Sequence, residues 1–472
     1  MDTQQVQEQA QPEDTGYQAT LTSRQVQMIA LGGSIGVGLF LGAGKRLHDV
    51  GPALILSYLV CGIAAFLVMR AIGELVMYRT TSGSFVEYAR EFIGPWAGYV
   101  CGWMFWMNWA FTGVAEISAI GTYVHRWIPG FPQWITALIA LGVLLSVNLV
   151  SVKLFGELEF WFAALKVTAI AAFLVVGTVL VSGSFKVGEY QAGVHNLTVP
   201  DGFFPHGIAV VLVSLQIVVF AYAGVEMVSI AAGETKDPHK IIPKAVNSVV
   251  WRIAIFYVGA VALLAMVLPP SAYGAKESPF VTAFSMLGVP WIGDVMNLVV
   301  LTAALSSVNS GMYSTARILK SMAENKQAPG VLSRMSTRHV PYAGILFTSA
   351  FYGCGVVLIA IVGAGEAFEV TVSIASLGVV AVWMAFLWCN LNLRRRALRG
   401  ELERPAFRMP GAPYTNWITL GFLALTVAMM AFSADEATRF AFYLLPVVVG
   451  VLALGWYFIS RNSRRAADSI SR

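Results

Sequence analysis

Apolar stretches of nearly constant length recur from one end of this chain to the other. Each has about the 20 residues that a helix needs to cross the hydrocarbon core of a bilayer. Only 12% of the 472 residues are charged, whereas a soluble domain carries about 25%. There is too little polar side chain to coat a water-soluble body of this size. The sequence therefore predicts an all-α integral membrane protein.

Twelve transmembrane helices fit these stretches. They lie near residues 25–45, 51–77, 95–125, 132–152, 158–182, 206–232, 248–269, 284–315, 341–363, 367–393, 415–433 and 440–460. An even number of spans puts both termini on one side of the membrane, and most of the 31 Lys and Arg residues then lie on that side. The other side receives Lys45, Arg46, Arg126, Lys186, Lys276 and Arg439. Because basic loops stay in the cytoplasm, both termini are predicted to be cytoplasmic.

The remaining composition excludes several functions. Residues 1–20 and 461–472 are expected to form cytoplasmic tails, the first of them disordered, and the N-terminal one lacks the pattern of a cleaved signal peptide. The basic loops account for the net charge of +5, so no nucleic-acid partner is expected. The four cysteines lie in apolar stretches without metal-ligand spacing. No metal site, cofactor or enzymatic nucleophile–base cluster is predicted.

The first span contains an unusual run of glycines, Ala30-Leu-Gly-Gly-Ser-Ile-Gly-Val-Gly-Leu-Phe40. Glycine is a poor helix former, so this run predicts a break in the middle of the span. A dinucleotide-binding loop is excluded by context. Such a loop follows a buried strand and precedes a soluble helix, whereas this run leads into another long apolar stretch.

The sixth span repeats this feature in Phe220-Ala-Tyr-Ala-Gly-Val-Glu226. Five spans separate the two runs, so the segments would cross the membrane in opposite directions. Paired interruptions in two halves are typical of transporters that bind their substrate at discontinuous helices. The freed N–H groups of such a break attract a carboxylate and the freed C=O groups an ammonium, which suits an amino acid. The alternative is that the glycines only allow close helix packing.

Three ionisable residues lie deep within predicted spans, where a charge is costly. Lys166 lies about 13 Å into the fifth span at 1.5 Å per residue. It either exchanges protons, since desolvation favours the neutral amine, or acts as a fixed ammonium that ties this span to carbonyls of the first break. Glu226 either couples to protons or holds the second break open. Glu116 either faces the cavity or pairs structurally. Arg70 and Glu74, one turn apart, are expected to form an ion pair.

These motifs resemble those of the amino-acid permeases of the amino acid–polyamine–organocation (APC) superfamily, and more narrowly its bacterial amino acid transporter family. The resemblance runs from about Gly16 through the last span. It is carried by Gly32–Phe40, Ser82-Gly-Ser-Phe85, Glu157-Leu-Glu-Phe-Trp161, Phe220–Glu226, Ala232–Pro238 and Met409-Pro-Gly-Ala-Pro413. Within the family, stretches such as Arg24–Ala30 and Val340–Ile345 are most similar to members that transport L-asparagine.

The resemblance implies the inverted-repeat fold of leucine-type transporters. Residues 21–182 would form the first five-helix repeat and residues 206–396 the second, with helices 1 and 6 broken, and residues 414–460 would form two peripheral helices. The implied substrate-binding residues are Ser34, Ile35, Gly36, Val37, Gly38, Thr112, Phe220, Ala223, Gly224 and Glu226. Among them, the N–H groups of Val37 and Gly38 would bind the carboxylate, and the carbonyls of Ser34, Phe220 and Ala223 the ammonium. Val37 departs from the threonine of many relatives.

Lys166 matches a lysine that replaces a sodium ion in proton-driven relatives, and Glu226 and Glu116 are further proton-coupling candidates. We therefore expect an importer of a small neutral amino acid, L-asparagine first, driven by proton symport with alternating access in the bacterial inner membrane. Its partners would be the amino acid, H⁺ and the lipid bilayer. Permeation of D-serine, D-alanine or glycine is the alternative within the family, and a membrane sensor that does not transport is the alternative in another class. A side chain at Gly38 is expected to crowd the substrate carboxylate.

Overall fold

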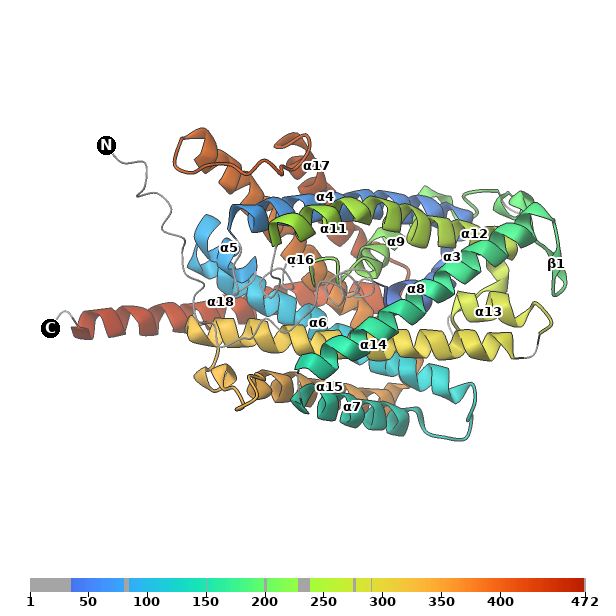
Figure 1. Ribbon diagram of the computed structural model, residues 1–472, viewed down its shortest axis with the longest axis horizontal. Coiled ribbons are helices and arrows are strands. Elements are labelled where there is room, and N and C mark those ends of the chain that lie inside the picture. Colours follow the sequence, from blue (N-terminus) through green and yellow to red (C-terminus); the bar gives the residue numbers. More distant parts are fainter. Residues whose placement is uncertain are drawn as a thin grey trace.

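Long helices that run roughly along one common axis make up the computed structural model (Figure 1). It describes residues 35–79, 85–150, 152–198, 202–227, 238–274, 277–289 and 291–470. The helices are α2 (Val37–Phe40), α3 (Gly42–Val50), α4 (Leu54–Tyr78), α5 (Phe85–Phe92), α6 (Pro95–His125), α7 (Gln133–Val150), α8 (Val152–Ser182), α9 (Gly207–Ala221), α11 (Pro238–Arg252), the π-helical η3 (Ile253–Gly259), α12 (Ala260–Val267), α13 (Pro279–Ser285), α14 (Ile292–Glu324), α15 (Tyr342–Val362), α16 (Ala364–Leu398), α17 (Tyr414–Met430) and α18 (Glu436–Ile470).

The connections are short. Turns of 3₁₀ helix lie at η1 (Gly51–Ala53), η2 (Val194–Leu197), η4 (Pro270–Ala272) and η5 (Gly330–Ser333). Strands β1 (Lys186–Val187) and β2 (Tyr190–Gln191) form an antiparallel hairpin in which Lys186 pairs with Gln191. This hairpin lies at one end of the bundle (Figure 1).

The prediction of a multi-span, largely helical membrane protein is confirmed, with the short β1–β2 hairpin as an addition to the predicted all-α fold. In the described part of the chain, eight helical segments are long and apolar enough to cross a membrane. They are Gly42–Tyr78, Gln133–Val150, Phe155–Ser182, Lys240–Val267, Ile292–Glu324, Tyr342–Val362, Ala364–Leu398 and Glu436–Arg461, and the shorter apolar helices α9 and α17 accompany them. In lipid this architecture satisfies the backbone, because each helix pairs its own N–H and C=O groups.

Helix α6 lies at the centre of the bundle and packs against both α14 and α16. Most of the apolar windows of α14 and α16 are buried, whereas the residues of the α18 window are half-buried or exposed. Large apolar side chains of α18, including Val447, Val451 and Leu454, are more than half exposed. An apolar surface of this kind is suited to contact with lipid tails.

Several observed helices differ from their predicted ranges by more than two residues, as at the start of α8 and the end of α18. The stretch predicted as one span over 284–315 is divided, since α13 ends at Ser285, Gly288 adopts a φ of +75°, and α14 begins at Ile292 and runs to Glu324. Its last turns carry charges that lower the local hydropathy. They remain helical because Lys320 pairs with Glu324 at 2.7 Å and Arg317 lies over the Tyr313 ring at 3.4 Å. The span predicted at 248–269 begins earlier, at Lys240.

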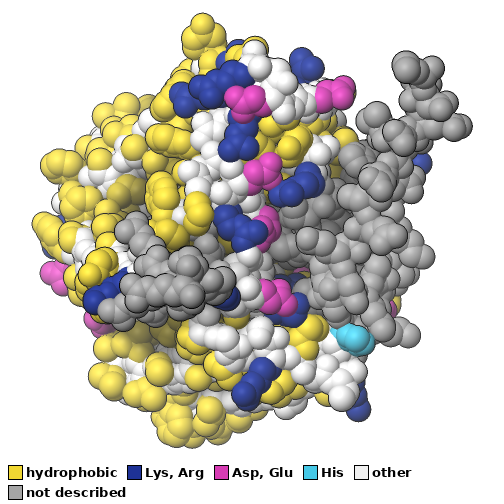
Figure 2. Space-filling model, turned by 90° about the vertical axis from the view of Figure 1, so that its left-hand side faces the viewer, with side chains coloured by type: hydrophobic (Ala, Val, Ile, Leu, Met, Phe, Trp, Pro, Cys, Tyr) yellow, Lys and Arg dark blue, Asp and Glu magenta, His cyan; other side chains and the backbone are white. Residues whose placement is uncertain are grey.

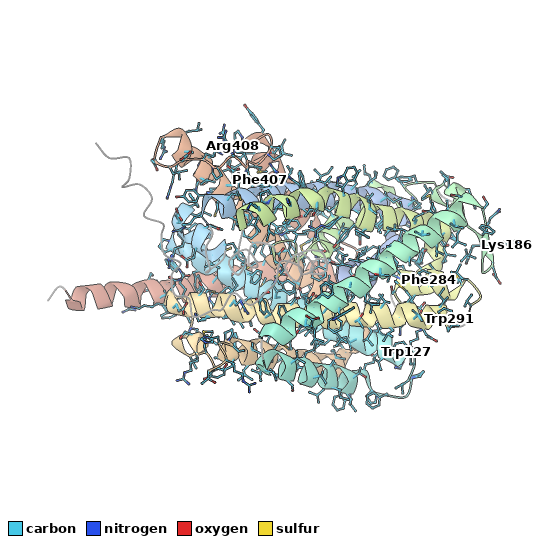
Figure 3. All side chains as sticks on the ribbon, in the orientation of Figure 1. Trp127, Lys186, Phe284, Trp291, Phe407 and Arg408 are labelled. Carbon is cyan, nitrogen blue, oxygen red and sulfur yellow. The ribbon has the colours of Figure 1, made fainter. Side chains whose placement is uncertain are left out.

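The two ends of the bundle differ in their side chains. Arg408 lies toward the end from which α18 projects, whereas Lys186, Trp127 and Trp291 lie at the opposite end (Figure 3). Lys and Arg side chains gather on the first of these ends, interspersed with Asp and Glu (Figure 2). The residues predicted as a C-terminal tail continue α18 as a helix to Ile470.

Candidate functional site

The chain enters α2 through an irregular segment. Ile35 and Gly36 are not helical, and Gly36 has an extended backbone with φ −122° and ψ −163°. Its C=O accepts hydrogen bonds from the N–H groups of Leu39 and Phe40, both at 3.2 Å. The helix therefore starts at Val37, deep within the apolar core. Ser34, the remaining predicted residue of this break, lies outside the described residues.

Gly36 and Gly38 are both sites of close approach. A Cβ atom at Gly36 would lie 3.0 Å from Glu116 Oε1. A Cβ atom at Gly38 would lie 2.7 Å from the Cα atom of Ala221 in α9. The side-chain direction of Gly38 is thus filled by α9, so the expectation that a side chain there would meet the substrate carboxylate is wrong. At this position, the glycine permits close packing of two helices.

Helix α9 ends inside the bundle, as the second glycine run predicts. The N–H of Tyr222 donates to the C=O of Val219 at 3.1 Å, and the N–H of Ala223 to that of Phe220 at 2.9 Å. Tight turns of this kind replace the α-helical pattern. Gly224 follows with a φ of +93°, a conformation that glycine adopts without strain. Residues 228–237, which would form the second half of this segment, lie outside the described residues.

Glu226 closes back on this turn. Its Oε2 atom accepts the N–H of Gly224 at 3.1 Å, and its side chain is 1% exposed. The indole of Trp383 from α16 lies beside the carboxylate. In this geometry the Glu226 side chain holds the turn in place, which is one of the two roles considered for it. The other role, proton coupling, stays a prediction.

Lys166 of α8 contacts the first break directly. Its Nζ atom donates to the C=O of Ile35 at 3.2 Å and to Ser306 Oγ of α14 at 3.0 Å. The side chain is 1% exposed. Three segments that are distant in sequence therefore meet at this ammonium.

Glu116 of α6 lies on the neighbouring side of the break. Its Oε1 atom accepts the N–H of Val37 at 3.4 Å, and the Ser307 hydroxyl also hydrogen-bonds to the carboxylate. Oε2 is buried and has no hydrogen-bond partner among the described residues. Thr112 lies one turn earlier on the same helix, where its hydroxyl donates to Asn108 Oδ1 at 3.2 Å. The N–H predicted to bind a substrate carboxylate thus meets a carboxylate of the protein.

Sequence reasoning did not single out Glu159, Ser306 or Ser307 as members of this site. Glu159 belongs to a motif of the family resemblance, but no role followed from that. Its spacing from Lys166 carried a usable signal, because residues seven apart lie two turns apart on one face of a helix. The two serines of α14 gave no such signal, since a serine in an apolar helix is common.

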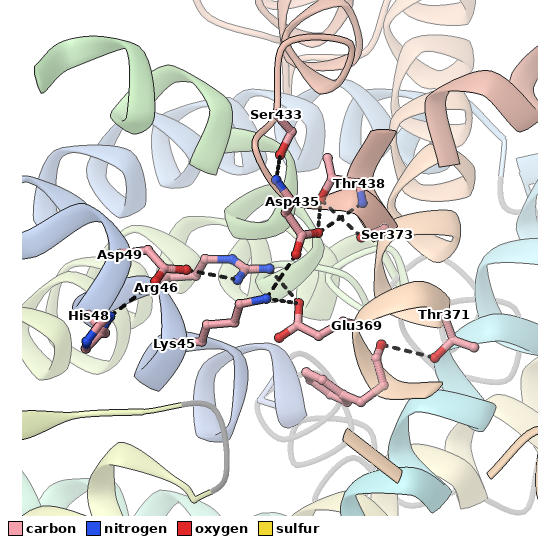
Figure 4. A network of polar contacts seen from close by, with 11 residues as sticks. Lys45, Arg46, His48, Asp49, Glu369, Thr371, Ser373, Ser433, Asp435 and Thr438 are labelled. Carbon is pink, nitrogen blue, oxygen red and sulfur yellow. Dashed lines mark hydrogen bonds and ion pairs between the residues drawn. The ribbon is translucent and has the colours of Figure 1, made fainter. Parts of the chain in front are cut away.

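A cluster of charges joins α3, α16 and the α17–α18 connection at the end of α3 (Figure 4). Lys45 Nζ lies 3.0 Å from Asp435 Oδ1 and 3.5 Å from Glu369 Oε2, and Arg46 Nη2 lies 2.8 Å from that same Glu369 atom. Burial alone would raise the pKa of Asp435, but the Lys45 ammonium, with help from Arg46 and Thr438, holds that pKa below its usual value. Lys45, Glu369 and Asp435 also line a cavity of about 1040 Å³, whose wall includes Leu41 at the end of α2.

At the other end of the bundle, the predicted Arg70–Glu74 ion pair is replaced by different partners. Glu74 is fully buried and accepts from Arg404 Nε at 2.5 Å, Asn390 Nδ2 at 3.0 Å and the Met409 N–H at 2.7 Å. Arg70 instead donates to Asn247 Oδ1 at 2.9 Å. The partner of Glu74 comes from a connection more than 300 residues away, which helical spacing could not reveal.

In the described part of the chain, helix α2 starts and helix α9 ends inside a multi-span bundle, beside buried ionisable side chains, and this arrangement is typical of membrane transport proteins. The family model described as amino acid permease matches residues 25–468. The chain belongs to this amino acid permease family, part of the APC superfamily.

Curated relatives of the chain carry more specific names. The chain is 51% identical over 451 residues to an "L-asparagine permease" of Escherichia coli (strain K12), an alignment that covers 95% of this chain and 90% of the relative. It is equally identical to an "L-asparagine permease" of Streptomyces coelicolor, of which 92% is covered. "L-asparagine permease 1" of Mycobacterium tuberculosis is 50% identical over 452 residues. Permeases are transporters, so the family is not one of enzymes.

Proposed function

We propose that this protein imports L-asparagine together with a proton, by alternating access, across the inner membrane of a bacterium. The observation that carries the proposal is the contact of Lys166 Nζ with the Ile35 carbonyl, two residues before the Val37 N–H. A titratable cation and the start of α2 are thereby joined within one small region, where a substrate and a proton can influence each other.

The substrate assignment combines this geometry with the relatives. The start of α2 offers N–H groups to a carboxylate, and the end of α9 offers the carbonyls of Phe220 and Ala223 to an ammonium. The Phe220 C=O accepts from Ala223, but a carbonyl has two lone pairs and can take a second donor. L-asparagine is favoured over D-serine, D-alanine and glycine because bacterial relatives at 50–51% identity are named for it.

Glu116 supports a link between proton and substrate. Its carboxylate accepts the Val37 N–H, so a substrate carboxylate would have to replace it there. Two carboxylates at one site repel each other, and a proton on Glu116 would remove that repulsion. We infer that protonation of Glu116 or a shift of charge on Lys166 accompanies substrate binding.

The described helices are compatible with twelve crossings. We assign them to α2–α3, α4, α6, α7, α8, α9 with the segment after it, α11–η3–α12, α14, α15, α16, α17 and α18. The first five would form one repeat (21–182) and the next five its inverted copy (206–396), with α17 and α18 (414–460) peripheral. The gathering of basic side chains at the end from which α18 projects supports cytoplasmic termini.

Uptake of radiolabelled L-asparagine into proteoliposomes tests this proposal. An inwardly directed proton gradient should drive accumulation, since one charge moved through 100 mV gains about 2.3 kcal/mol, and an uncoupler should abolish it. Competition with unlabelled D-serine, D-alanine, glycine and L-glutamine ranks the alternatives. Accumulation that is insensitive to the uncoupler would contradict proton coupling, and saturable binding without uptake would favour a sensor.

A further inference from the structure

A second buried carboxylate, that of Glu159, is connected to Lys166. Glu159 is fully buried in α8. Its Oε1 atom accepts the hydroxyl hydrogen of Ser306 at 2.7 Å, while Ser306 Oγ itself accepts from Lys166 Nζ at 3.0 Å. One hydroxyl thus receives a hydrogen bond from the ammonium and gives one to the carboxylate.

The second oxygen of Glu159 shows that the carboxylate is not fully satisfied. Oε2 is buried and has no hydrogen-bond partner within the described ranges. An ionised carboxylate in an apolar helix is costly unless its oxygens are paired. A purely structural anchor would be expected to fill both oxygens, as Glu74 does with its four hydrogen bonds. Glu159 therefore retains the capacity to take a proton.

The positions of the three residues give the connection a direction. Glu159 precedes Lys166 by two helical turns, about 10 Å along α8. It lies nearer to the start of α8, and Ser306 lies on α14 with Tyr313 two turns further along. Phe155, one turn before Glu159, stacks on Tyr313 with ring centroids 3.9 Å apart. The path thus leads from the Ile35 carbonyl toward the cytoplasmic end of our proposed topology, and the stacked rings of Phe155 and Tyr313 lie beyond Glu159 on that side.

We propose that Glu159 is the proton acceptor of Lys166 on the way to the cytoplasm, with the Ser306 hydroxyl as the relay. A proton leaves Lys166 Nζ for Ser306 Oγ as the hydroxyl proton of Ser306 moves to Glu159 Oε1. Lys166 becomes neutral, Glu159 becomes neutral, and Ser306 is unchanged, so charge and atoms balance. Separation of Phe155 from Tyr313 then exposes Glu159 and releases the proton. This inference rests on the proposed proton symport and assigns its release route.

The charges around the relay determine how it responds to pH. Among the described residues, the charged groups that act on Lys166 are Glu159 on its own helix and Glu116 on α6. Glu116 accepts the Val37 N–H of the break directly, whereas Glu159 is connected to the break through Ser306 and Lys166. Loss of Glu159 should leave substrate binding at α2 and α9 in place while it removes the release route.

The test uses two measurements on each variant in proteoliposomes. Concentrative uptake of L-asparagine under a proton gradient reports coupling, and counterflow exchange without a gradient reports binding and carrier movement. The variants are Glu159→Gln, Ser306→Ala and Ser306→Thr, with Glu157→Gln as the matched control. Glu157 lies on the same helix, is exposed, and accepts from the Trp161 indole.

We expect Glu159→Gln and Ser306→Ala to lose concentrative uptake by about 10²-fold, as for removal of a positioned proton-transfer group, and to keep counterflow close to that of the unmodified protein. Ser306→Thr retains the hydroxyl and should retain uptake, as should Glu157→Gln. The pH dependence of uptake should flatten only in the first two variants.

Two outcomes would overturn the relay. Full proton-driven accumulation by Glu159→Gln would remove this carboxylate from the route, and equal loss of counterflow and uptake would make it a structural residue. Failure of the proposed function is recognised separately, because the unmodified protein would then show no response to the proton gradient.

Discussion

The ammonium of Lys166 donates a hydrogen bond of 3.2 Å to the carbonyl of Ile35, the residue before Gly36 at the entry to α2. A cation on α8 thereby contacts the irregular backbone that leads into α2. This contact is compatible with both roles considered for Lys166, that of a proton carrier and that of a structural tie. The two roles predict different effects on concentrative uptake when an uncharged residue replaces the lysine.

Lys166→Met keeps the apolar stem but removes the charge. If Lys166 carries the proton, concentrative uptake of L-asparagine is lost while the protein still folds and exchanges substrate. Thermal unfolding of the purified protein checks the fold. Lys186→Met is the control, because Lys186 is exposed on the hairpin at one end of the bundle. A variant that accumulates substrate under a proton gradient would show that the lysine is only a tie.

Gly38→Ala should destabilise the protein, since the new Cβ atom would lie 2.7 Å from the Ala221 Cα atom. Overpacking of this kind costs about 1–3 kcal/mol. Because the nearest atom is backbone, Ala221→Gly in the same molecule should not restore stability. Gly42→Ala is the control, with its nearest atom at 3.8 Å. Equal melting temperatures for the two alanine variants would refute the packing role of Gly38.

Glu116→Gln should bind L-asparagine more tightly, by up to about tenfold or 1.4 kcal/mol. The amide carries no charge to repel the substrate carboxylate from the Val37 N–H. Binding to detergent-solubilised protein at a series of pH values measures this: the gain should appear at alkaline pH, where the native carboxyl is ionised, and vanish at acid pH, where it is protonated. Glu366→Gln, an exposed carboxylate at the start of α16, should change nothing. Weaker binding by Glu116→Gln would mean that the carboxylate assists the substrate.

Asp435→Asn tests the charge cluster at the end of α3. Asn still caps the start of α18, where the Thr438 N–H donates to Asp435 Oδ2 at 3.0 Å, but it loses the ion pair with Lys45. Asp435→Ala loses both and should cost about 1 kcal/mol more. The pKa of Asp435 is lowered in the folded protein. The stabilisation by its ion pair with Lys45 is therefore fully present at pH values above the usual Asp pKa, and it is lost as the pH falls through the lowered pKa.

The destabilisation by Asp435→Asn should therefore stay constant between about pH 5 and 8, well above the usual Asp pKa of about 3.9. Thermal unfolding at a series of pH values measures it. A difference from the unmodified protein that disappears on going from pH 8 to 6 would show that the carboxyl takes up a proton in that range, contrary to its pairing with Lys45.

The sequence predicted the helices best where chain-breaking residues mark both ends. Helices α6 and α15 lie within one residue of their predicted ranges. Gly94 and Pro95 mark the start of α6 and Pro129-Gly130 follow its end, while Pro341 and Gly363 flank α15. The end of α14 was missed by nine residues. Hydropathy counts Arg317 and Lys320 as polar, but their partners on the same helix let them remain in it.

The site was predictable only in part, because its partners come from distant segments. The glycine runs and the depth of Lys166 located the two breaks. They did not indicate that Gly38 faces Ala221, that Ser306 joins Lys166 to Glu159, or that Arg404 would displace Arg70 from Glu74. Each of these depends on the tertiary register of helices, which one sequence with its local periodicities does not contain.

The length of α18 has a practical consequence. Its apolar window ends by Arg461, and the helix continues to Ile470, which adds about 13 Å of stiff rod at 1.5 Å per residue. A fluorescent protein or affinity tag joined to the C-terminus would be held clear of the bundle's face. Reporter fusions at that terminus should therefore leave the transport cycle undisturbed.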